Sequence, residues 1–529
     1  MAERQETGPT RWLTKRITGT RRCSVKLAEQ RFEGTMKSST DYRALKAFNV
    51  RLRAARLEES RSHGIQTNNG DESRYPNRIA SYSKGLRHDA LGEVVANSYE
   101  SLLHALKSVI PAAFEQIILG GDRKLTNPMA GLAFCMQGPD PGAVRMRPAP
   151  CFSSAEQAGE LVESYWMSLA RDIPFLQYDS NSIIDRAVRD LRQFASFDGV
   201  ASSSIFRGDA RGVCDGPFVS QFLWKAVTLG AQTVNPKIRT GPPGLDHAVT
   251  FSDWLLLQTG NTPWPSLKDP IARYIRNGRD LSHLVHYDVL FQVFVNALYI
   301  LYAIGARRSR HDPYLKSETQ AGFLTFGSAH IESLLCAVVG PALRATWYQK
   351  WFVHRRSRPE SFAGRLHNHV LHLASYPFHS DLFRSNALDE IYSRNRTYLL
   401  PQAYPEGCPT HPSYPAGHAA VAGACTTILK AFFDEEDLIR QPVQPSIDGT
   451  ALVPYEGSDL TVKGELNKLA YNIAIGRNFA GIHWRSDAEE SLKLGEDVAI
   501  AFLREERACL PESFQGYSFT RFDGSCTTV

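Results

Sequence analysis

Apolar residues recur every three or four positions through much of the chain, which predicts a protein built mainly from α-helices. Between Asn97 and Ile118, for example, the leucine, valine, isoleucine and phenylalanine positions fall on one helical face. Few runs alternate apolar and polar residues with the period of two that a half-buried strand requires. We therefore expect bundles of packed helices over these ranges: 97–118, 153–172, 181–196, 217–230, 281–304, 324–347, 361–374, 416–433, 462–480 and 487–504.

Stretches rich in Gly, Pro and Asp separate the predicted helices and indicate loops, at 235–250, 259–270, 309–320 and 436–460. Two Ser-x-x-Glu patterns, starting at Ser153 and at Ser486, predict helix starts. In such a capping box the serine hydroxyl and the glutamate carboxylate accept hydrogen bonds from amides that have no partner inside the helix.

The chain divides into a basic N-terminal arm over residues 1–75 and a single large helical domain over 76–529. The arm is polar and rich in Ser, Thr and Gly, so we expect it to be partly disordered or to wrap a neighbouring subunit. The rest is taken as one domain because the candidate site residues span 347–487 and must converge in one body.

Composition is that of an ordinary soluble globular protein, with 43% hydrophobic and 22% charged residues. A net charge of +5 is too small to make nucleic acid the expected partner. The nine cysteines include no C-x-x-C pair, which argues against a zinc or thiol redox motif.

No targeting segment is evident, so a cytoplasmic location is favoured. The first thirty residues carry several arginines but no apolar core of a signal peptide. The most apolar stretch, Val285 to Ile304, is interrupted by His, Asp, Gln and Asn. These polar residues fit a buried core helix better than a membrane span.

The stretch from His411 to His418, with the sequence His-Pro-Ser-Tyr-Pro-Ala-Gly-His, is the first candidate for chemistry. Its prolines delay helix formation until Gly417, and the small apolar residues that follow predict a buried helix. The first amides of a helix have no intrahelical partner and readily bind anions. The side chain of His418, in that first turn, is able to exchange protons with a bound oxyanion.

Two further segments supply positive charge and another histidine. Lys350 stands eight residues before Arg358, and Arg477 stands six residues before His483. Single Lys and Arg residues usually mark a solvated surface. Three cations, helix-start amides and two histidines together, however, suit a tetrahedral oxyanion such as phosphate or its structural mimic vanadate.

A proline and a glycine allow the side chains at these spacings to reach one site. On an uninterrupted helix, residues eight or six apart would not share a face. Pro359 pushes the residue before it out of helical geometry, so Arg358 would project from the exit of the helix that carries Lys350. Gly481 is a predicted helix stop, which places His483 in a turn between two helices.

In their order and spacing, the three segments resemble the site of the vanadium-dependent haloperoxidases, which is shared with the type 2 phosphatidic acid phosphatases. The spacing Lys-x7-Arg-Pro resembles the algal and bacterial bromoperoxidase branch, whereas phosphatases and fungal chloroperoxidases typically have x6. The likeness covers about residues 75–529 and includes Ser-Lys-Gly-Leu-Arg-His-Asp at 83–89, Leu-Thr-Asn-Pro-Met-Ala-Gly-Leu-Ala-Phe at 125–134 and Phe-Thr-Arg-Phe-Asp-Gly at 519–524.

The resemblance implies a vanadate cofactor, bound by cations, imidazoles and one amide: Lys350, Arg358, Gly417, His418, Arg477 and His483. A ring nitrogen of His483 would bind the vanadium, and the cations would neutralise the vanadate oxygens. His418 would deprotonate hydrogen peroxide and protonate the departing water. The residues expected to be catalytic are His418, Lys350, Arg358, Arg477 and His411.

The implied activity is oxidation of a halide by hydrogen peroxide to a hypohalous acid equivalent, which halogenates small organic substrates. Trp347 and His411 are expected in the halide pocket. A histidine at 411 goes with bromide in the branch that the chain resembles, whereas Trp347 matches the chloroperoxidases. Bromide is easier to oxidise and is the expected halide, with chloride still open. The branch commonly assembles as dimers or larger rings, so a homo-oligomer is expected.

Ala416 departs from the family, which often has Ser-Gly-His where this chain has Ala-Gly-His. Loss of the hydroxyl is expected to weaken vanadate binding by roughly 1.5–3 kcal/mol, the usual net value of a hydrogen bond to a charged group. It also motivates one alternative, an inactive homologue that only binds an oxyanion. A second alternative is a phosphatase inhibited by vanadate, with His483 as nucleophile and His418 as general acid.

Other polar residues admit two interpretations. Asp487 would either support a site residue or stabilise a helix start, and His354 would either support the site or lie apart from it. His283, His286 and Asp288 are expected as hydrogen-bonded core residues, with Asp288 also a candidate partner of a site histidine. Charges expected at the surface or in subunit contacts are Arg355, Arg356 and Arg485.

Overall fold

The computed structural model describes the chain over residues 39–60, 65–262 and 264–529. The chain divides into two units, Met1–Arg61 and Ser62–Val529. In the first unit the described part is one helix, α2 (Ser39–Ser60). The rest of the predicted arm up to residue 38 lies outside the described residues, and its role in wrapping a neighbouring subunit stays a prediction.

The second unit is mainly α, which confirms the predicted fold class. Its helices are α3 (Asp71–Arg74), α4 (Ala96–Ser108), α5 (Pro111–Phe114), α6 (Ala155–Ala170), α7 (Ser182–Leu191), α8 (Phe251–Gln258), α9 (Gly278–Tyr287), α10 (Gln292–Ala303), α11 (Ser328–Tyr348), α12 (Pro359–Val370), α13 (Asn386–Asn395), α14 (Gly417–Phe432), α15 (Val462–Phe479) and α16 (Arg485–Cys509).

Short elements connect these helices. The described strands form three antiparallel hairpins: β1 (Val227–Leu229) with β2 (Gln232–Val234), β3 (Val443–Pro445) with β4 (Leu452–Pro454), and β5 (Ser518–Thr520) with β6 (Cys526–Thr528). Helical turns of other types are η1 (Pro76–Arg78), η2 (Pro128–Leu132), η3 (Phe175–Ser180), η4 (Ala195–Phe197), η5 (Gln221–Leu223), η6 (Pro313–Lys316), η7 (Gln349–His354) and η8 (Ser380–Arg384).

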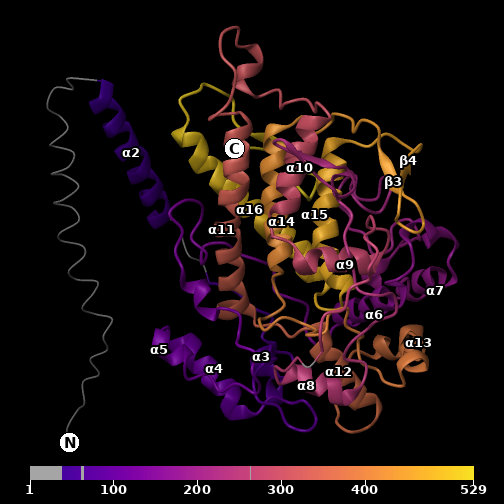
Figure 1. Cartoon of the computed structure of the whole chain (residues 1–529). Helices are drawn as coiled ribbons and strands as arrows, with labels where there is room; N and C mark the ends of the chain where they lie inside the picture. The colour runs from indigo at the N-terminus through magenta and orange to yellow at the C-terminus, as the bar shows by residue number, and fades with distance from the viewer. Residues whose placement is uncertain (1–38, 61–64, 263) are drawn as a thin grey trace, which may run out of the picture. The chain divides into compact units, whose positions relative to one another are not determined.

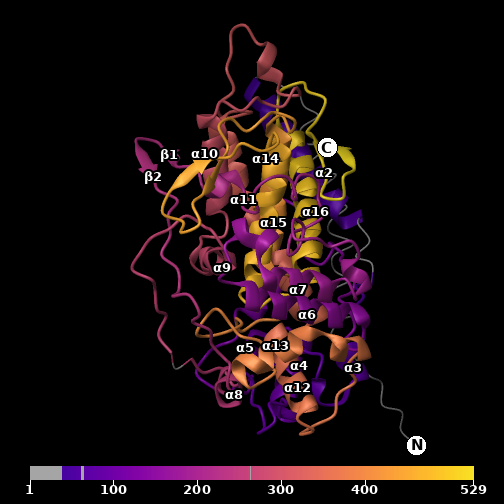
Figure 2. The ribbon, with the colours of Figure 1, turned by 90° about the vertical axis from the view of Figure 1, so that its right-hand side faces the viewer.

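Four long helices form the centre of the second unit. α14 packs against α11, α15 and α16, and the four run side by side in both views (Figures 1 and 2). Every residue of α14 except His418 is buried, and so is every residue of α15. Glycine allows the closest approach: a Cβ at Gly423 would lie 2.1 Å from the carbonyl oxygen of Leu492, and one at Gly495 only 1.9 Å from that of Ala420.

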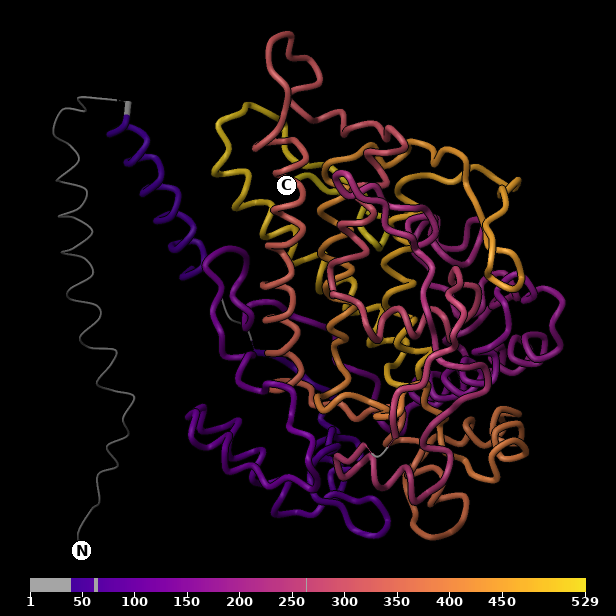
Figure 3. The backbone as a smooth tube through the Cα atoms, viewed as in Figure 1, coloured from indigo at the N-terminus to yellow at the C-terminus, as the bar shows by residue number. Residues whose placement is uncertain are grey.

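A second group of helices gathers at the end of this bundle where α11 ends and α14 begins. It consists of α6, α7, α8, α12 and α13, of which α6 contacts α7, α12 and α13 (Figure 2). The irregular segment 396–416 leads to α14 at the same end of the bundle (Figure 3). Polar side chains from helix ends and from this segment therefore meet where regular structure stops.

Two predicted helices are broken in the structure. The one over 97–118 divides at Val109, whose left-handed backbone (φ 51°) separates α4 from α5. The one over 281–304 divides into α9 and α10, which are bent by 106°. Among the described residues no single helix is long and apolar enough to cross a membrane, and this bent pair passes that test only when its two helices are taken together.

The helix predicted over 217–230 is wrong. This range holds the short turn η5 and then strand β1, which pairs with β2. The β-branched residues of Val227–Leu229 favour the strand, and Gly230 supplies the left-handed residue (φ 60°) that the hairpin turn requires. Helices α8 and α13 were not predicted; the eight residues of α8 span little more than two turns, too few to show a clear period.

The predicted capping boxes are each displaced. At the start of α6 the cap is Ser154 rather than Ser153, and its hydroxyl accepts an amide hydrogen bond of 3.1 Å. α16 begins one residue before Ser486, and Asp487 rather than a glutamate accepts the amide of Trp484 (3.1 Å). Asp487 is consequently available to do more than cap a helix.

The close packing of α14 on α16 predicts that a single added methyl group destabilises the protein. Gly495→Ala would place that methyl against the Ala420 carbonyl and should lower the free energy of unfolding by about 1–3 kcal/mol. Denaturant unfolding of the variant and the parent measures this, and a Gly495→Ala protein as stable as the parent would contradict the packing.

Candidate active site

The segment carrying Lys350 and Arg358 leaves helical geometry as predicted. α11 runs into the π-helical turn η7, which contains Lys350 and is followed by Arg355, a residue with left-handed backbone (φ 42°). Arg358 is extended (φ −87°, ψ 156°) and directly precedes Pro359, the first residue of α12. The two cations thus project from consecutive breaks in the helical chain and reach the same place.

The predicted stop after Arg477 is also present. α15 ends at Phe479, and Gly481 adopts φ 82° while its amide donates to the carbonyl of Asn478 (2.8 Å). Arg477 therefore lies in the last turn of α15, and His483 lies in the short turn before α16. Such a turn, bounded by two buried helices, holds an imidazole rigidly.

Arg358 joins the three segments. Its Nη1 donates to Nε2 of His483 (3.0 Å) and to the carbonyl of Ile482 (2.9 Å). Its Nε and Nη2 donate to the carbonyl of His411 (3.0 and 2.9 Å), and Nη2 also lies 3.0 Å from Nδ1 of that histidine. Because a guanidinium only donates, Nε2 of His483 and Nδ1 of His411 are the nitrogens that carry lone pairs.

The other ring nitrogen of His483 is held by a buried network. Nδ1 donates to Oδ2 of Asp487 (2.8 Å), whose Oδ1 accepts from Nη1 of Arg356 (2.8 Å). Arg356 pairs in turn with Glu160 (2.7 Å) and is only 5% exposed, so its expected position at the surface is wrong. Asp487 thus fulfils both of its interpretations: it accepts the amide of Trp484 at the start of α16, and it fixes the tautomer of His483 with Nε2 directed at the site.

The three site cations are buried without a carboxylate partner. Lys350 and Arg358 are fully buried and Arg477 is 8% exposed. Lys350 donates to the carbonyls of Pro412 (2.6 Å) and Ser413 (3.0 Å). In the part of the chain that the structure describes, no salt bridge joins any of the three to an Asp or Glu.

Arg477 has donor capacity to spare. Its Nη1 donates to the carbonyl of Val285 (2.8 Å), but its Nε is buried with no hydrogen-bond partner among the described residues. The guanidinium also lies 5.5 Å from the ring centroid of Tyr404. A buried donor without a partner costs free energy unless a ligand binds it.

Burial and mutual repulsion shift the ionisation of the site. Burial lowers the pKa of Lys350 well below its usual value, and the nearby Arg358 and Arg477 lower it further. Burial likewise lowers the pKa of His483 well below 6.5, with Arg358 and Lys350 adding to the effect. The pKa of His411 is lowered well below 6.5 for the same reasons. His483 and His411 are therefore neutral at neutral pH.

His418 is paired with Asp288. Its Nε2 donates to Oδ1 of Asp288 (3.0 Å), whose side chain is only 2% exposed. Burial lowers the pKa of His418, Arg477 lowers it further, and the hydrogen bond to Asp288 acts in the opposite direction. Of the two interpretations of Asp288, the structure supports that of a partner to a site histidine.

The expected halide residues lie together. The rings of Trp347 and His411 have centroids 5.1 Å apart and an interplanar angle of 40°. Nε1 of Trp347 donates to the carbonyl of Thr126 (3.1 Å), and Nζ of Lys350 lies 6.0 Å from its ring centroid. A Cβ at Gly417 would lie 3.4 Å from the Trp347 ring, so the first residue of α14 lies beside this pair of rings.

Tyr404 is a site residue that the sequence did not indicate. It lies beneath Arg477 and stacks on His286 with centroids 3.8 Å apart and planes at 6°. His286 in turn contacts Glu406 through Nε2 (2.6 Å). Tyr404 lies in an irregular, proline-flanked segment without periodicity, so no sequence pattern marks it.

Several other expectations are corrected. His283 is buried, but both of its ring nitrogens lack a partner among the described residues, so it is not a satisfied core histidine. Arg355 pairs with Glu72, and both side chains are half-buried rather than free at the surface. Arg485 is held by Glu163 within the body. His354 packs edge-on against Tyr414 at 4.8 Å.

Comparisons with known proteins agree with this arrangement. A model described as the VCPO second helical-bundle domain matches residues 334–510. A vanadium-dependent bromoperoxidase of Ascophyllum nodosum is 36% identical over 90% of this chain and 91% of its own length. The enzymes of that name from Corallina pilulifera and Corallina officinalis are each 33% identical over 92% of this chain and 98% of their own lengths.

A solved structure agrees as well. The homohexameric second vanadate-dependent bromoperoxidase of Ascophyllum nodosum superposes with a TM-score of 0.88 and 32% identity, over 93% of this chain and 91% of that one. The resemblance inferred from the three segments is therefore confirmed, and the chain belongs to the vanadium-dependent haloperoxidase family.

Proposed function

We propose that this protein is a vanadate-dependent bromoperoxidase, which uses hydrogen peroxide to oxidise bromide to a hypobromous acid equivalent that brominates small organic molecules. The observation that carries the proposal is the cluster of Lys350, Arg358 and Arg477 around Nε2 of a neutral His483, buried and without a carboxylate partner among the described residues. The names of the bromoperoxidase relatives support the halide and the oxidant.

The residues fit a vanadate ion. Three cations balance the charge of the oxygens, and the donor capacity of Arg477 Nε is unused by the protein. Asp487 holds the proton of His483 at Nδ1, so the lone pair is at Nε2; it accepts from Nη1 of Arg358, a donor that a bound ion would displace. Vanadate in such a site would act as a Lewis acid that activates peroxide without changing its own oxidation state.

The protein's own part in the reaction is proton transfer and orientation. With Nε2 bonded to Asp288, neutral His418 accepts the first proton of hydrogen peroxide at Nδ1 and returns it to the departing water. Lys350, Arg358 and Arg477 hold the reacting oxygens in a site whose burial strengthens each charge interaction.

The wall formed by Trp347 and His411 is assigned to the halide. Both rings are held by hydrogen bonds to neighbouring segments, and His411 is neutral, so the wall offers polarisable ring faces without a fixed negative charge. We also assign the protein to a homo-oligomer, an assignment supported by the homohexameric relative from Ascophyllum nodosum.

Vanadate distinguishes this function from the phosphatase alternative. Adding vanadate to the metal-free protein should switch on bromination of monochlorodimedone by peroxide and bromide, whereas it would inhibit a phosphatase.

Substitutions at the proposed vanadium ligand test the same function. His483→Ala should lose vanadate binding, and its bromination activity should fall at least about 100-fold. The activity of Asp487→Asn should fall about 10–100-fold, because the imidazole loses its orienting partner. His104→Ala, at an exposed position of α4, is the control. Full bromination by His483→Ala would contradict the assignment.

Vanadate binding should be coupled to proton uptake. Burial and the neighbouring Arg358 and Arg477 lower the pKa of Lys350, and a bound anion would raise that pKa again. Vanadate binding should therefore take up protons, and the vanadate affinity should fall as the pH rises through the lowered pKa of Lys350. Calorimetry in Hepes and in Tris measures the protons bound, and Lys350→Met should bind fewer. Equal uptake by the two proteins would contradict the prediction.

Restoring the hydroxyl of the family should tighten the cofactor. Ala416→Ser places a hydroxyl directly before the first residue of α14, where the side chain is buried at the cluster. A hydrogen bond to a charged oxygen is worth about 1.5–3 kcal/mol, which corresponds to roughly 10- to 150-fold in the vanadate dissociation constant. Ala419→Ser, at the third residue of the same buried helix, is the matched control. Equal constants for Ala416→Ser and the parent would show that the hydroxyl is not needed.

A further inference from the structure

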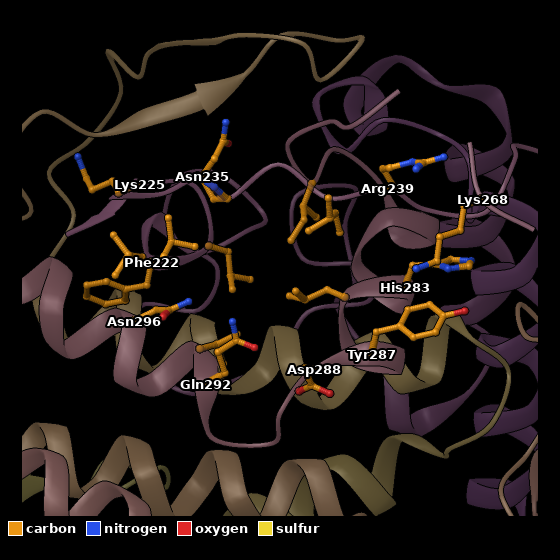
Figure 4. A pocket seen from close by; sticks show the side chains of 18 residues that line it. Phe222, Lys225, Asn235, Arg239, Lys268, His283, Tyr287, Asp288, Gln292 and Asn296 are labelled. Carbon is orange, nitrogen blue, oxygen red and sulfur yellow. The ribbon is translucent and has the colours of Figure 1, made fainter. Parts of the chain in front are cut away.

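A cavity of about 450 Å³ lies beside the site and is not used by the chemistry described so far. It is enclosed by η5, by the β1–β2 hairpin with the loop after it, and by the bend between α9 and α10 (Figure 4). Asp288, at that bend, lines the cavity and at the same time bonds His418 through Oδ1. One carboxylate therefore separates the cavity from the proposed acid–base residue.

The cavity combines an apolar interior with a cationic mouth. Its interior includes the buried side chains of Phe222, Val227, Ile275 and Val293. Its mouth carries positive charge from three residues: Lys225, Arg239 and Lys268. The volume is in the range of about 300–1,000 Å³ typical of sites for small organic ligands.

An unsatisfied imidazole borders this space. His283 lines the cavity, is 5% exposed, and has no hydrogen-bond partner at either ring nitrogen among the described residues. In Figure 4 it lies on the same side of the cavity as Tyr287 and Lys268, and the Lys268 ammonium lies 4.2 Å from the centroid of the Tyr287 ring. A ligand hydroxyl would satisfy the imidazole, which otherwise stays buried at a cost in free energy.

We propose that this cavity binds the organic acceptor of the halogenation, and that the acceptor is a phenol bearing an anionic group; this rests on the proposed bromoperoxidase function. The ring lies among the apolar side chains, the phenolic hydroxyl bonds His283, and the anionic group faces Arg239 and Lys268. Hypobromous acid formed beside His418 then meets an acceptor already bound beyond Asp288.

The transfer balances without a further reagent. A ring carbon of the phenol supplies the electron pair of the new C–Br bond, the O–Br bond of hypobromous acid breaks, and its oxygen keeps that bonding pair. The ring carbon loses its proton, which joins the hydroxide, so the products are the bromophenol and water. The ring is oxidised by two electrons and the bromine is reduced by two.

Direct binding tests the proposal without any turnover. 4-Hydroxybenzoate should bind the full-length protein in a saturable one-to-one manner in calorimetric titration without peroxide. Val234→Trp, which fills the cavity, should weaken that binding about tenfold or more. Thr233→Trp, exposed on the neighbouring position of β2 and outside the cavity, should leave it unchanged. No saturable binding, or equal affinities of the two variants, would overturn the proposal.

Charge gives a second, independent comparison. Arg239→Gln combined with Lys268→Gln should weaken 4-hydroxybenzoate about three- to tenfold and leave its neutral methyl ester unaffected, because exposed charge pairs are each of modest strength. Lys237→Gln, a nearby lysine that lies over Tyr274 rather than in the cavity, is the control. Equal losses for the acid and its ester would contradict the assigned position of the anionic group.

Activity separates this proposal from the function on which it depends. In Val234→Trp the Michaelis constant for 4-hydroxybenzoate should rise, while the release of dioxygen from peroxide and bromide alone stays at the parent rate. That release arises when a second peroxide reduces hypobromous acid, so it needs no acceptor. If the parent protein releases no dioxygen from peroxide and bromide, the bromoperoxidase function is contradicted. If the Michaelis constant of Val234→Trp for 4-hydroxybenzoate equals that of the parent, the acceptor site is contradicted but the bromoperoxidase function is not. This conclusion holds whether or not sedimentation shows a changed subunit number.

Discussion

Positive charge buried without a carboxylate partner is the constraint on which the site depends. Lys350, Arg358 and Arg477 converge within one cluster, where backbone carbonyls rather than Asp or Glu accept their hydrogen bonds. Each buried ion costs several kcal/mol unless its charge is compensated. Three such cations kept together support the proposed anion site, because an anionic ligand would recover that cost.

The surrounding fold holds the three cations together against their mutual repulsion, through contacts that do not neutralise their charge. Asp487 accepts a hydrogen bond from Nδ1 of His483. It is itself held by Arg356, which also pairs with Glu160. The carboxylate of Asp487 thus bonds the back of the imidazole and Arg356, and it reaches Lys350 and Arg358 only through space. Close glycine contacts between α14 and α16 keep the helix starts and ends of the bundle from moving apart.

The bend between α9 and α10 links the two halves of the proposed chemistry. Were the apolar run one straight helix, neither the cavity nor the position of Asp288 would exist. The bend instead exposes a carboxylate that bonds His418 and lines the space facing His283. In the proposed chemistry the single side chain of Asp288 thus supports proton transfer to peroxide and lines the site of the acceptor. This arrangement suits a reaction in which the hypobromous acid must react close to where it forms.

The sequence by itself determined the helical class, the family and the local geometry of the site cations, since Pro359 and Gly481 act on the residues next to them. It did not determine the partners. Asp487 and Asp288 had two interpretations each, and Arg356 was assigned to the surface, because burial and pairing depend on segments hundreds of residues apart. The bend within the helix predicted over 281–304 was likewise decided only by tertiary packing, since periodicity indicates a helical face but not where the chain turns.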